Sequence, residues 1–178
     1  MKYFCSDKKN WQYNTISNNG NKWFNYIEGY KMISEYIEKE ILENDRSYQD
    51  FLLFPYCFSI RHYIEISLKE IIENGSKRIG EDVITSHSLL LLLNKLTPIL
   101  DKLGMGETPQ NVQNFINELH GIDSKSDNFR YPIDTKGNPT LENIDSINFK
   151  RVSDGFKEVK NYFEFVSASI ENNEAMKT

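Results

Sequence analysis

The sequence predicts an all-α fold: a five-helix bundle with a small irregular or hairpin insertion before the last helix. Apolar residues recur at three- and four-residue steps in several separate stretches, the pattern of amphipathic helices. Short polar segments rich in Asn, Gly and Ser separate these stretches, as turns between helices do. The segment between His120 and Asn143 lacks the helical period, which places the insertion there.

Length and composition predict one domain. The chain has 178 residues and 39% apolar residues, including 11 Phe and 10 Tyr, which is enough material for one well-filled core. We expect a loose N-terminal lead-in at 1–20, a helical-bundle domain at 21–172 and a C-terminal tail at 173–178. The net charge of −5 excludes a broad positively charged surface for nucleic acid, so any contact with RNA must be local.

The sequence favours a cytoplasmic protein without a membrane segment. No apolar stretch like that of a signal peptide occurs near the N-terminus. The most apolar runs, 51–60 and 89–93, are far shorter than the roughly 20 residues that cross a bilayer. Cys5 lies in a polar segment and Cys57 in an apolar one, so we expect no disulfide between them and a reducing compartment.

The first two helices are predicted from their apolar period and from turn residues. Apolar positions from Trp23 onward predict an amphipathic helix that ends near Glu43. Ser47 or Asp50 is then a suitable N-cap for a second helix, apolar on nearly all sides. Pro55 falls near its first turns, where proline is tolerated. The sequence Asn-Gly-Ser at 74–76 is expected to end this helix.

Three further helices follow. Thr85 or Ser86 is a predicted N-cap for a leucine-rich helix at 89–103, which Gly104 should end. Thr108 followed by Pro109 predicts the start of a short fourth helix.

The insertion and the last helix complete the chain. The insertion resembles a hairpin around Lys136-Gly137-Asn138. The last helix is predicted from Phe149 to about Ile170, with Asn148 as a cap and Gly155 as a weak point.

The second helix carries a polar stripe. At ~100° per residue, Arg61, His62, Glu65 and Lys69 share one arc of an otherwise apolar rod. One interpretation is that Glu65 forms ordinary helix salt bridges with Arg61 and Lys69. The other is that the stripe lines a cleft or a dimer seam, where His62 titrates near neutrality and Arg61 holds an anion. A base and a cation are what acid–base cleavage of RNA requires.

Two further residues are candidates for the same site. His87 opens the third helix, where it is either a plain helix-end residue or a base kept neutral by the helix N-terminus. Arg130 lies between aromatic residues and can stack on them, reach a carboxylate such as Glu65 or Glu118, or share a cleft with Arg61. The predicted catalytic residues are thus Arg61, His62, Glu65 and His87, and the predicted binding residues are Lys69 and Arg130.

Several cofactor motifs are missing from the sequence. It contains no phosphate loop, dinucleotide fingerprint, zinc-finger spacing, His-Glu-x-x-His motif or nucleophile elbow. With 3 His far apart and 2 Cys, a metal site built by the protein is not expected. We therefore expect a protein that works without a cofactor.

Three runs carry a family resemblance: FLLFPYCFSIRHYIEISLKEII, SHSLLLLLNKLTPIL and FRYPIDTKGNP. They resemble small bacterial proteins of the HEPN superfamily, a helical-bundle group rich in toxins and anti-phage effectors. The resemblance spans about 23–170. It implies functional roles for the Arg-His pair with its following Glu and Lys, for the histidine that opens the third helix, and for the arginine of Phe-Arg-Tyr-Pro. These residues are Arg61, His62, Glu65, Lys69, His87 and Arg130.

The sequence also departs from the family pattern. HEPN ribonucleases carry an Arg-x4-6-His motif on one helix, and their dimers join two such motifs into a metal-independent RNA-cutting site. Here Arg61 adjoins His62 and Arg78 is too far from His87, so no pair has that spacing.

The resemblance implies a homodimer that binds or cleaves RNA in a bacterial defence or toxin–antitoxin setting. One alternative is a non-catalytic interaction module that pairs with itself or with a protein encoded nearby. The other is a binder of an anionic nucleotide.

Overall fold

The computed structural model describes residues 9, 22–44, 46–83 and 85–175. Within them the chain forms an all-α bundle, which confirms the predicted fold class. The predicted lead-in, apart from Lys9, lies outside the described residues, as do Cys5 and residues 176–178. The helices are α1 (Phe24–Glu43), α2 (Arg46–Ile79), α3 (Leu89–Leu103), α4 (Gln110–Ile122) and α5 (Phe149–Ala175). None of these helices is long and apolar enough to span a membrane.

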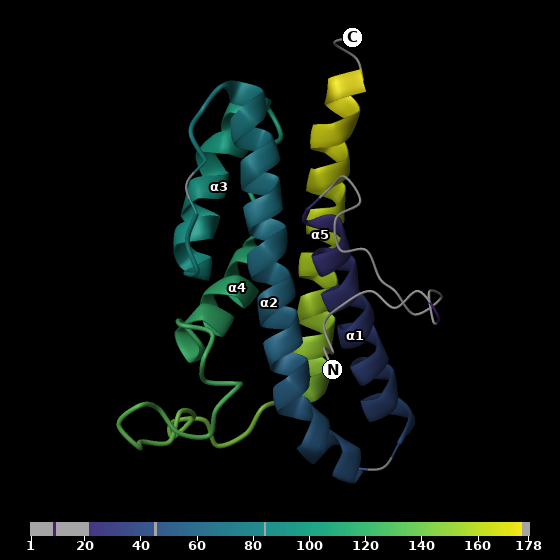
Figure 1. Ribbon diagram of the computed structural model, residues 1–178, viewed down its shortest axis with the longest axis vertical. Helices are drawn as coiled ribbons and strands as arrows, with labels where there is room; N and C mark the ends of the chain where they lie inside the picture. Colours follow the sequence, from purple (N-terminus) through teal and green to yellow (C-terminus); the bar gives the residue numbers. More distant parts are fainter. Residues whose placement is uncertain (1–8, 10–21, 45, 84, 176–178) are drawn as a thin grey trace.

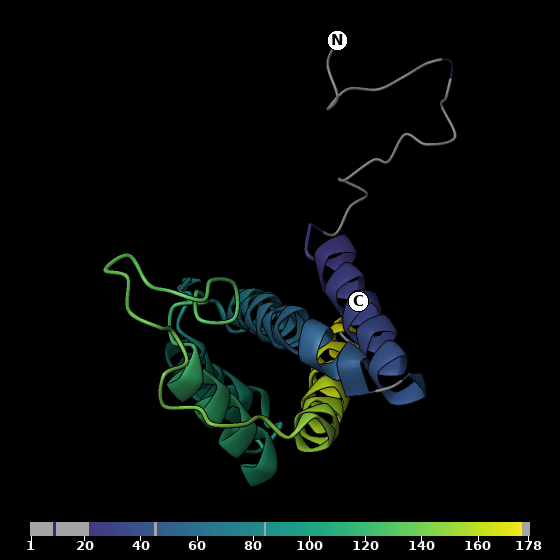
Figure 2. The same ribbon diagram turned by 90° about the horizontal axis from the view of Figure 1, so that it is seen from below.

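Helix α2 is the central rod of the bundle. It lies between α1 and α5 on one side and α3 and α4 on the other (Figures 1 and 2). It packs directly against α1, α3 and α5. The segment between α4 and α5 extends from one end of the bundle (Figure 1).

This central position explains why α2 is apolar on nearly all sides. Its buried positions face three other helices within the shared core, and full burial of such a side chain contributes about 1.5–3 kcal/mol. Burial also raises the pKa of the free Cys57 thiol to about 12. The buried apolar residues of α2 are Tyr56, Cys57, Ile60, Tyr63, Ile64, Ile66, Leu68, Ile71 and Ile72.

The predicted end of the second helix is wrong. Helix α2 runs through the Asn-Gly-Ser sequence to Ile79 and ends at Gly80, whose φ is +73°. A Cβ atom on Gly75 would lie 2.5 Å from Cγ2 of Ile99 on α3. Gly75 therefore allows α2 and α3 to approach closely, and this packing outweighs the local tendency to turn.

The start of α2 also differs from the prediction. The helix begins at Arg46, so Ser47 and Asp50 lie inside it rather than at its cap. Pro55 is then an interior residue, and its missing N–H removes one helical hydrogen bond. Figure 1 shows α2 bent toward this end, as expected for an interior proline.

Caps set the ends of α3. Ser88, not Thr85 or Ser86, is the N-cap, and its hydroxyl accepts a hydrogen bond from the Leu91 N–H. The Ser86 hydroxyl instead accepts from the Ser88 N–H and shapes the approach to the helix. Gly104 adopts the left-handed conformation, with φ 68°, and ends α3 as predicted.

Helix α5 is longer than predicted and packs closely on α4. The Asn148 side chain accepts a hydrogen bond from the Arg151 N–H at the start of the helix, which agrees with its predicted capping role. The helix passes Ile170 and continues to Ala175. A Cβ on Gly155 would lie 2.4 Å from the Phe115 ring, so this glycine is a packing contact between α4 and α5.

The insertion is irregular. In the described part of the chain its only β pairing is a single antiparallel bridge between Ile133 and Pro139. Gly137, with φ +86°, turns the chain between them, as the predicted hairpin position requires.

Candidate functional site

Arg61 of α2 is fully buried and joins three parts of the chain. Its Nη1 donates to Oε2 of Glu65 at 2.7 Å, and its Nη2 donates to the His87 carbonyl at 2.9 Å. Its Nε donates to the Asp123 carbonyl at 3.1 Å. Arg61 therefore fixes the approach to α3 and the end of α4 against α2. The expectation that it binds an anion is corrected, because its guanidinium is sealed inside the protein.

Glu65 lies one turn further along α2 and is also buried. Its Oε1 accepts a hydrogen bond from Nζ of Lys69 at 2.7 Å and lies 2.8 Å from Nδ1 of His87. Burial acts to raise the pKa of Glu65, but the hydrogen bonds from Lys69 and Arg61 outweigh it and lower the pKa. The carboxylate is therefore ionised at neutral pH.

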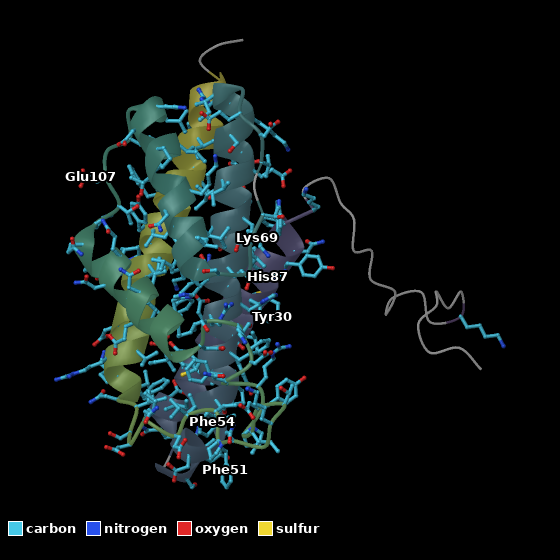
Figure 3. All side chains as sticks on the ribbon, turned by 90° about the vertical axis from the view of Figure 1, so that its left-hand side faces the viewer. Tyr30, Phe51, Phe54, Lys69, His87 and Glu107 are labelled. Atoms are coloured by element: carbon cyan, nitrogen blue, oxygen red, sulfur yellow. The ribbon has the colours of Figure 1, made fainter. Side chains whose placement is uncertain are left out.

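His87 is held by this carboxylate while remaining open to solvent. Its side chain is 83% exposed, although Nδ1 contacts the buried Glu65. Nζ of Lys69 lies 3.4 Å from the same nitrogen, and Figure 3 shows Lys69 and His87 next to each other on one face. A proton on Nδ1, shared with Glu65, leaves Nε2 with a lone pair facing solvent. A carboxylate that orients an imidazole in this way is a common arrangement for a general base.

His62 does not join this cluster. Its ring centroid lies 4.4 Å from that of Tyr30 on α1 and 5.9 Å from that of Phe58, on which it stacks. Burial lowers the pKa of His62, so its imidazole is neutral at pH 7. The helical arc placed His62 beside Lys69, but its ring turns toward α1.

Arg130 stacks on aromatic rings. Its Cζ lies 5.7 Å from the ring centroid of Phe58 and 5.4 Å from that of Tyr131. Its ion pair is with Asp127, not with Glu65 or Glu118. It also acts with burial to lower the pKa of His62, because its positive charge lies near that ring. Arg130 thus attaches the insertion to α2 by stacking.

Several of these side chains lie along one side of the bundle, called the α2 face below. Figure 3 shows Lys69, His87, Tyr30, Phe54 and Phe51 following one another along this side of the bundle. Phe51 is 78% exposed and Phe54 is 44% exposed, which is unusual for phenylalanine. The α2 face comprises Tyr30, Phe51, Phe54, Phe58, His62, Lys69, His87 and Arg130.

Sequence reasoning missed part of the site. Phe51, Phe54 and Phe58 recur at three- and four-residue steps that lead to His62, a signal that was available but indistinguishable from a core pattern. Asp123 was also missed. Its Oδ1 accepts from the N–H groups of Asp127 and Asn128, and its Oδ2 lies 3.7 Å from Nε of Arg61. No local pattern marks this residue, because its partner is distant in sequence.

No group of three or more His, Cys, Asp or Glu side chains is placed to hold a metal ion in the part of the chain that the structure describes. Comparison with protein-family models, with curated proteins and with solved structures gives no significant match.

Proposed function

We propose that this chain is a HEPN-like helical protein that binds and cleaves RNA without a metal ion, in a bacterial defence or toxin–antitoxin setting. The setting and the family rest on the sequence resemblance. The observation that carries the chemistry is the exposed His87 imidazole, with Nδ1 2.8 Å from the buried Glu65 carboxylate.

His87 acts as the general base in this proposal. Its Nε2 takes the proton of a ribose 2′-hydroxyl, and the freed oxygen attacks the adjacent phosphorus. The bond to the 5′-oxygen breaks, and that oxygen takes a proton from solvent water, which leaves a 2′,3′-cyclic phosphate and a 5′-hydroxyl. The imidazolium of His87 then returns its proton to solvent. Positioned proton transfer of this kind contributes about 10²–10⁴-fold in rate.

The remaining residues of the site support this chemistry. Glu65 fixes the tautomer and orientation of the imidazole, and Arg61 fixes Glu65. The Lys69 ammonium beside Nδ1 places positive charge near the reacting phosphate. Phe54 and Arg130 offer surfaces for unpaired bases, which bind proteins mainly by stacking. Such local binding agrees with a net charge of −5.

The test is an RNA cleavage assay in excess chelator. We expect purified protein to cut single-stranded RNA, and His87→Ala to lower the rate by about 100-fold or more, because the base is lost. Glu65→Gln keeps the shape of the orienting group but not its charge, and should also slow cleavage. His120→Ala, outside the α2 face, is the matched control. Absence of cleavage in the unaltered protein, or equal rates for His87→Ala and His120→Ala, would remove the enzyme proposal.

A second candidate is a non-catalytic interaction module that pairs with another copy or with a protein encoded nearby. The exposed rings of Phe51 and Phe54 favour it, since solvent-exposed aromatic clusters commonly mark interfaces. For a homodimer we expect Phe51→Asp with Phe54→Asp to give a monomer in size-exclusion chromatography with light scattering. Phe165→Asp, on an exposed ring of α5, is the control. A mass unchanged by the double substitution would argue against self-association through this surface.

A further inference from the structure

A pocket lies on the α1–α5 side of α2, where these three helices run beside one another (Figures 1 and 2). Its volume is about 220 Å³. The apolar part of its wall includes Tyr63 and Phe163, and its polar part includes Glu28, Glu70, Glu164 and Glu171. The pocket is therefore both aromatic and strongly acidic.

Glu70 is the buried carboxylate of this pocket, with an exposed fraction of 4%. Its hydrogen-bond donors are neutral: the Ser167 hydroxyl at 3.0 Å and the Asn74 amide. Burial raises the pKa of Glu70, and the negative charges of Glu171 and Glu73 add to this effect against the Ser167 hydrogen bond. A buried carboxylate without a cation is costly, and a positively charged group beside it would be strongly stabilised.

The lysines around the pocket pair with carboxylates other than Glu70, and Lys31 pairs with two carboxylates of the pocket wall itself. Nζ of Lys31 lies 2.6 Å from Glu164 and 3.7 Å from Glu28. Lys22 and Lys77 both pair with Glu73. In the part of the chain that the structure describes, Glu70 and Glu171 have no ion-pair partner.

A buried hydroxyl on the pocket wall points to a ligand independently of the carboxylates. Ser67 is only 3% exposed, and its Oγ has no hydrogen-bond partner of normal geometry among the described residues, although the Tyr63 hydroxyl is near. Buried hydroxyls are usually paired. A ligand with N–H donors would satisfy Ser67 and Glu70 together, because they lie one turn apart on α2 and line the same pocket.

We infer that this pocket binds a linear polyamine. One ammonium group donates to the Glu70 carboxylate and the Ser67 hydroxyl, while the methylene chain packs on the apolar side chains of Ile27 and Ala168, which line the same pocket. A second ammonium group reaches Glu171 at the pocket rim. The apolar part of the wall favours an alkylammonium ion, whose methylene groups can pack against it, over a hydrated metal ion. The inference does not depend on the proposed function, because no residue of the α2 face lines this pocket.

Isothermal titration calorimetry at constant ionic strength tests the inference, with putrescine and spermidine as probes. We expect saturable binding of one polyamine per chain. Glu70→Gln should weaken it at least tenfold, because the buried charge is lost while the side-chain shape is kept. Glu158→Gln, on the exposed side of α5, changes the net charge equally and should leave the affinity unchanged. Ala168→Phe fills the pocket while keeping the Glu70 carboxylate, and should abolish binding.

Several results would overturn the inference. They are the absence of saturable binding, an equal loss of affinity in both glutamine variants, and displacement of spermidine by an equivalent charge of MgCl₂. Binding of N-acetyl-lysine amide as tightly as spermidine would identify a protein lysine as the occupant instead. Thermal melts followed by circular dichroism establish that each variant is folded before it is titrated.

Discussion

At the scale of single residues, Glu65 is the centre of the site, because Arg61, Lys69 and His87 all approach its two oxygens. The contacts within α2 follow from four-residue spacing and were predictable from the sequence. The contact with His87 depends on the path of the chain before α3, and no local pattern contains it. The direction of the His62 ring was likewise decided by packing on Tyr30.

We expect Arg61→Met to destabilise the protein by about 3–5 kcal/mol, because it leaves Glu65 and two carbonyl groups buried with fewer partners. Urea unfolding followed by circular dichroism measures this change. Arg151→Met, on the exposed surface of α5, should cost less than about 0.5 kcal/mol. Similar losses of unfolding free energy in the two variants would mean that the buried ion pair adds little to stability.

His62 should make stability depend on pH between 7 and 5. Burial lowers its pKa from 6.5, so the unfolded chain binds the proton at a higher pH than the folded chain does. The stabilisation is therefore complete above pH 6.5 and is lost as the pH falls toward the folded-state pKa. We expect His62→Phe to reduce the difference between melting temperatures at pH 7 and pH 5. Glu65 affects the pH dependence of stability only at lower pH, because its pKa is lowered from 4.5. An unchanged pH dependence would exclude His62 as its source.

At the scale of helices, close packing overrides local signals. The bounds of α1 and α3 were predicted well, because their apolar period and the Gly104 cap act locally. The Asn-Gly-Ser sequence predicted an end to α2 that the contact of Gly75 with Ile99 prevents. Pro55 was expected in the first turns and instead lies well inside the helix. The error at the end of α2 therefore has its origin in tertiary packing, which the local sequence does not contain.

Gly75→Ala should destabilise the protein by about 1–3 kcal/mol, because the new methyl group overlaps Ile99 between α2 and α3. The control is Gly121→Ala in α4, where a Cβ atom meets nothing within 4 Å. That substitution should stabilise the helix by about 0.5–1 kcal/mol, since alanine is the better helix former. Denaturant midpoints of the two variants provide the comparison, and a stabilising Gly75→Ala would contradict the packing argument.

At the scale of the whole molecule, charge limits how the protein meets RNA. The net charge is −5, and the exposed cations of the α2 face are few. The fold class was predictable because it depends on summed periodicity, whereas the surface joining His87 to Phe54 exists only after the helices have packed. The acidic pocket between α1, α2 and α5 likewise combines residues from distant parts of the chain.

RNA binding should therefore depend only weakly on salt. Each phosphate neutralised on a single strand contributes a slope of about −0.7 in log K against log salt, so contacts through Lys69 and Arg130 predict a slope no steeper than about −2. Fluorescence anisotropy with labelled single-stranded RNA measures the slope between about 50 and 200 mM salt. A much steeper slope would require a cationic surface outside the α2 face.

The buried guanidinium of Arg61 has a kinetic consequence. It bonds to carbonyl groups that are 26 and 62 residues away along the chain, so both long loops must close before the contacts exist. Contacts of that kind form late, after the local helices, and their loss acts mainly on the rate of unfolding. We therefore expect Arg61 to slow the unfolding of the native state while contributing little to the rate at which the helices associate during folding.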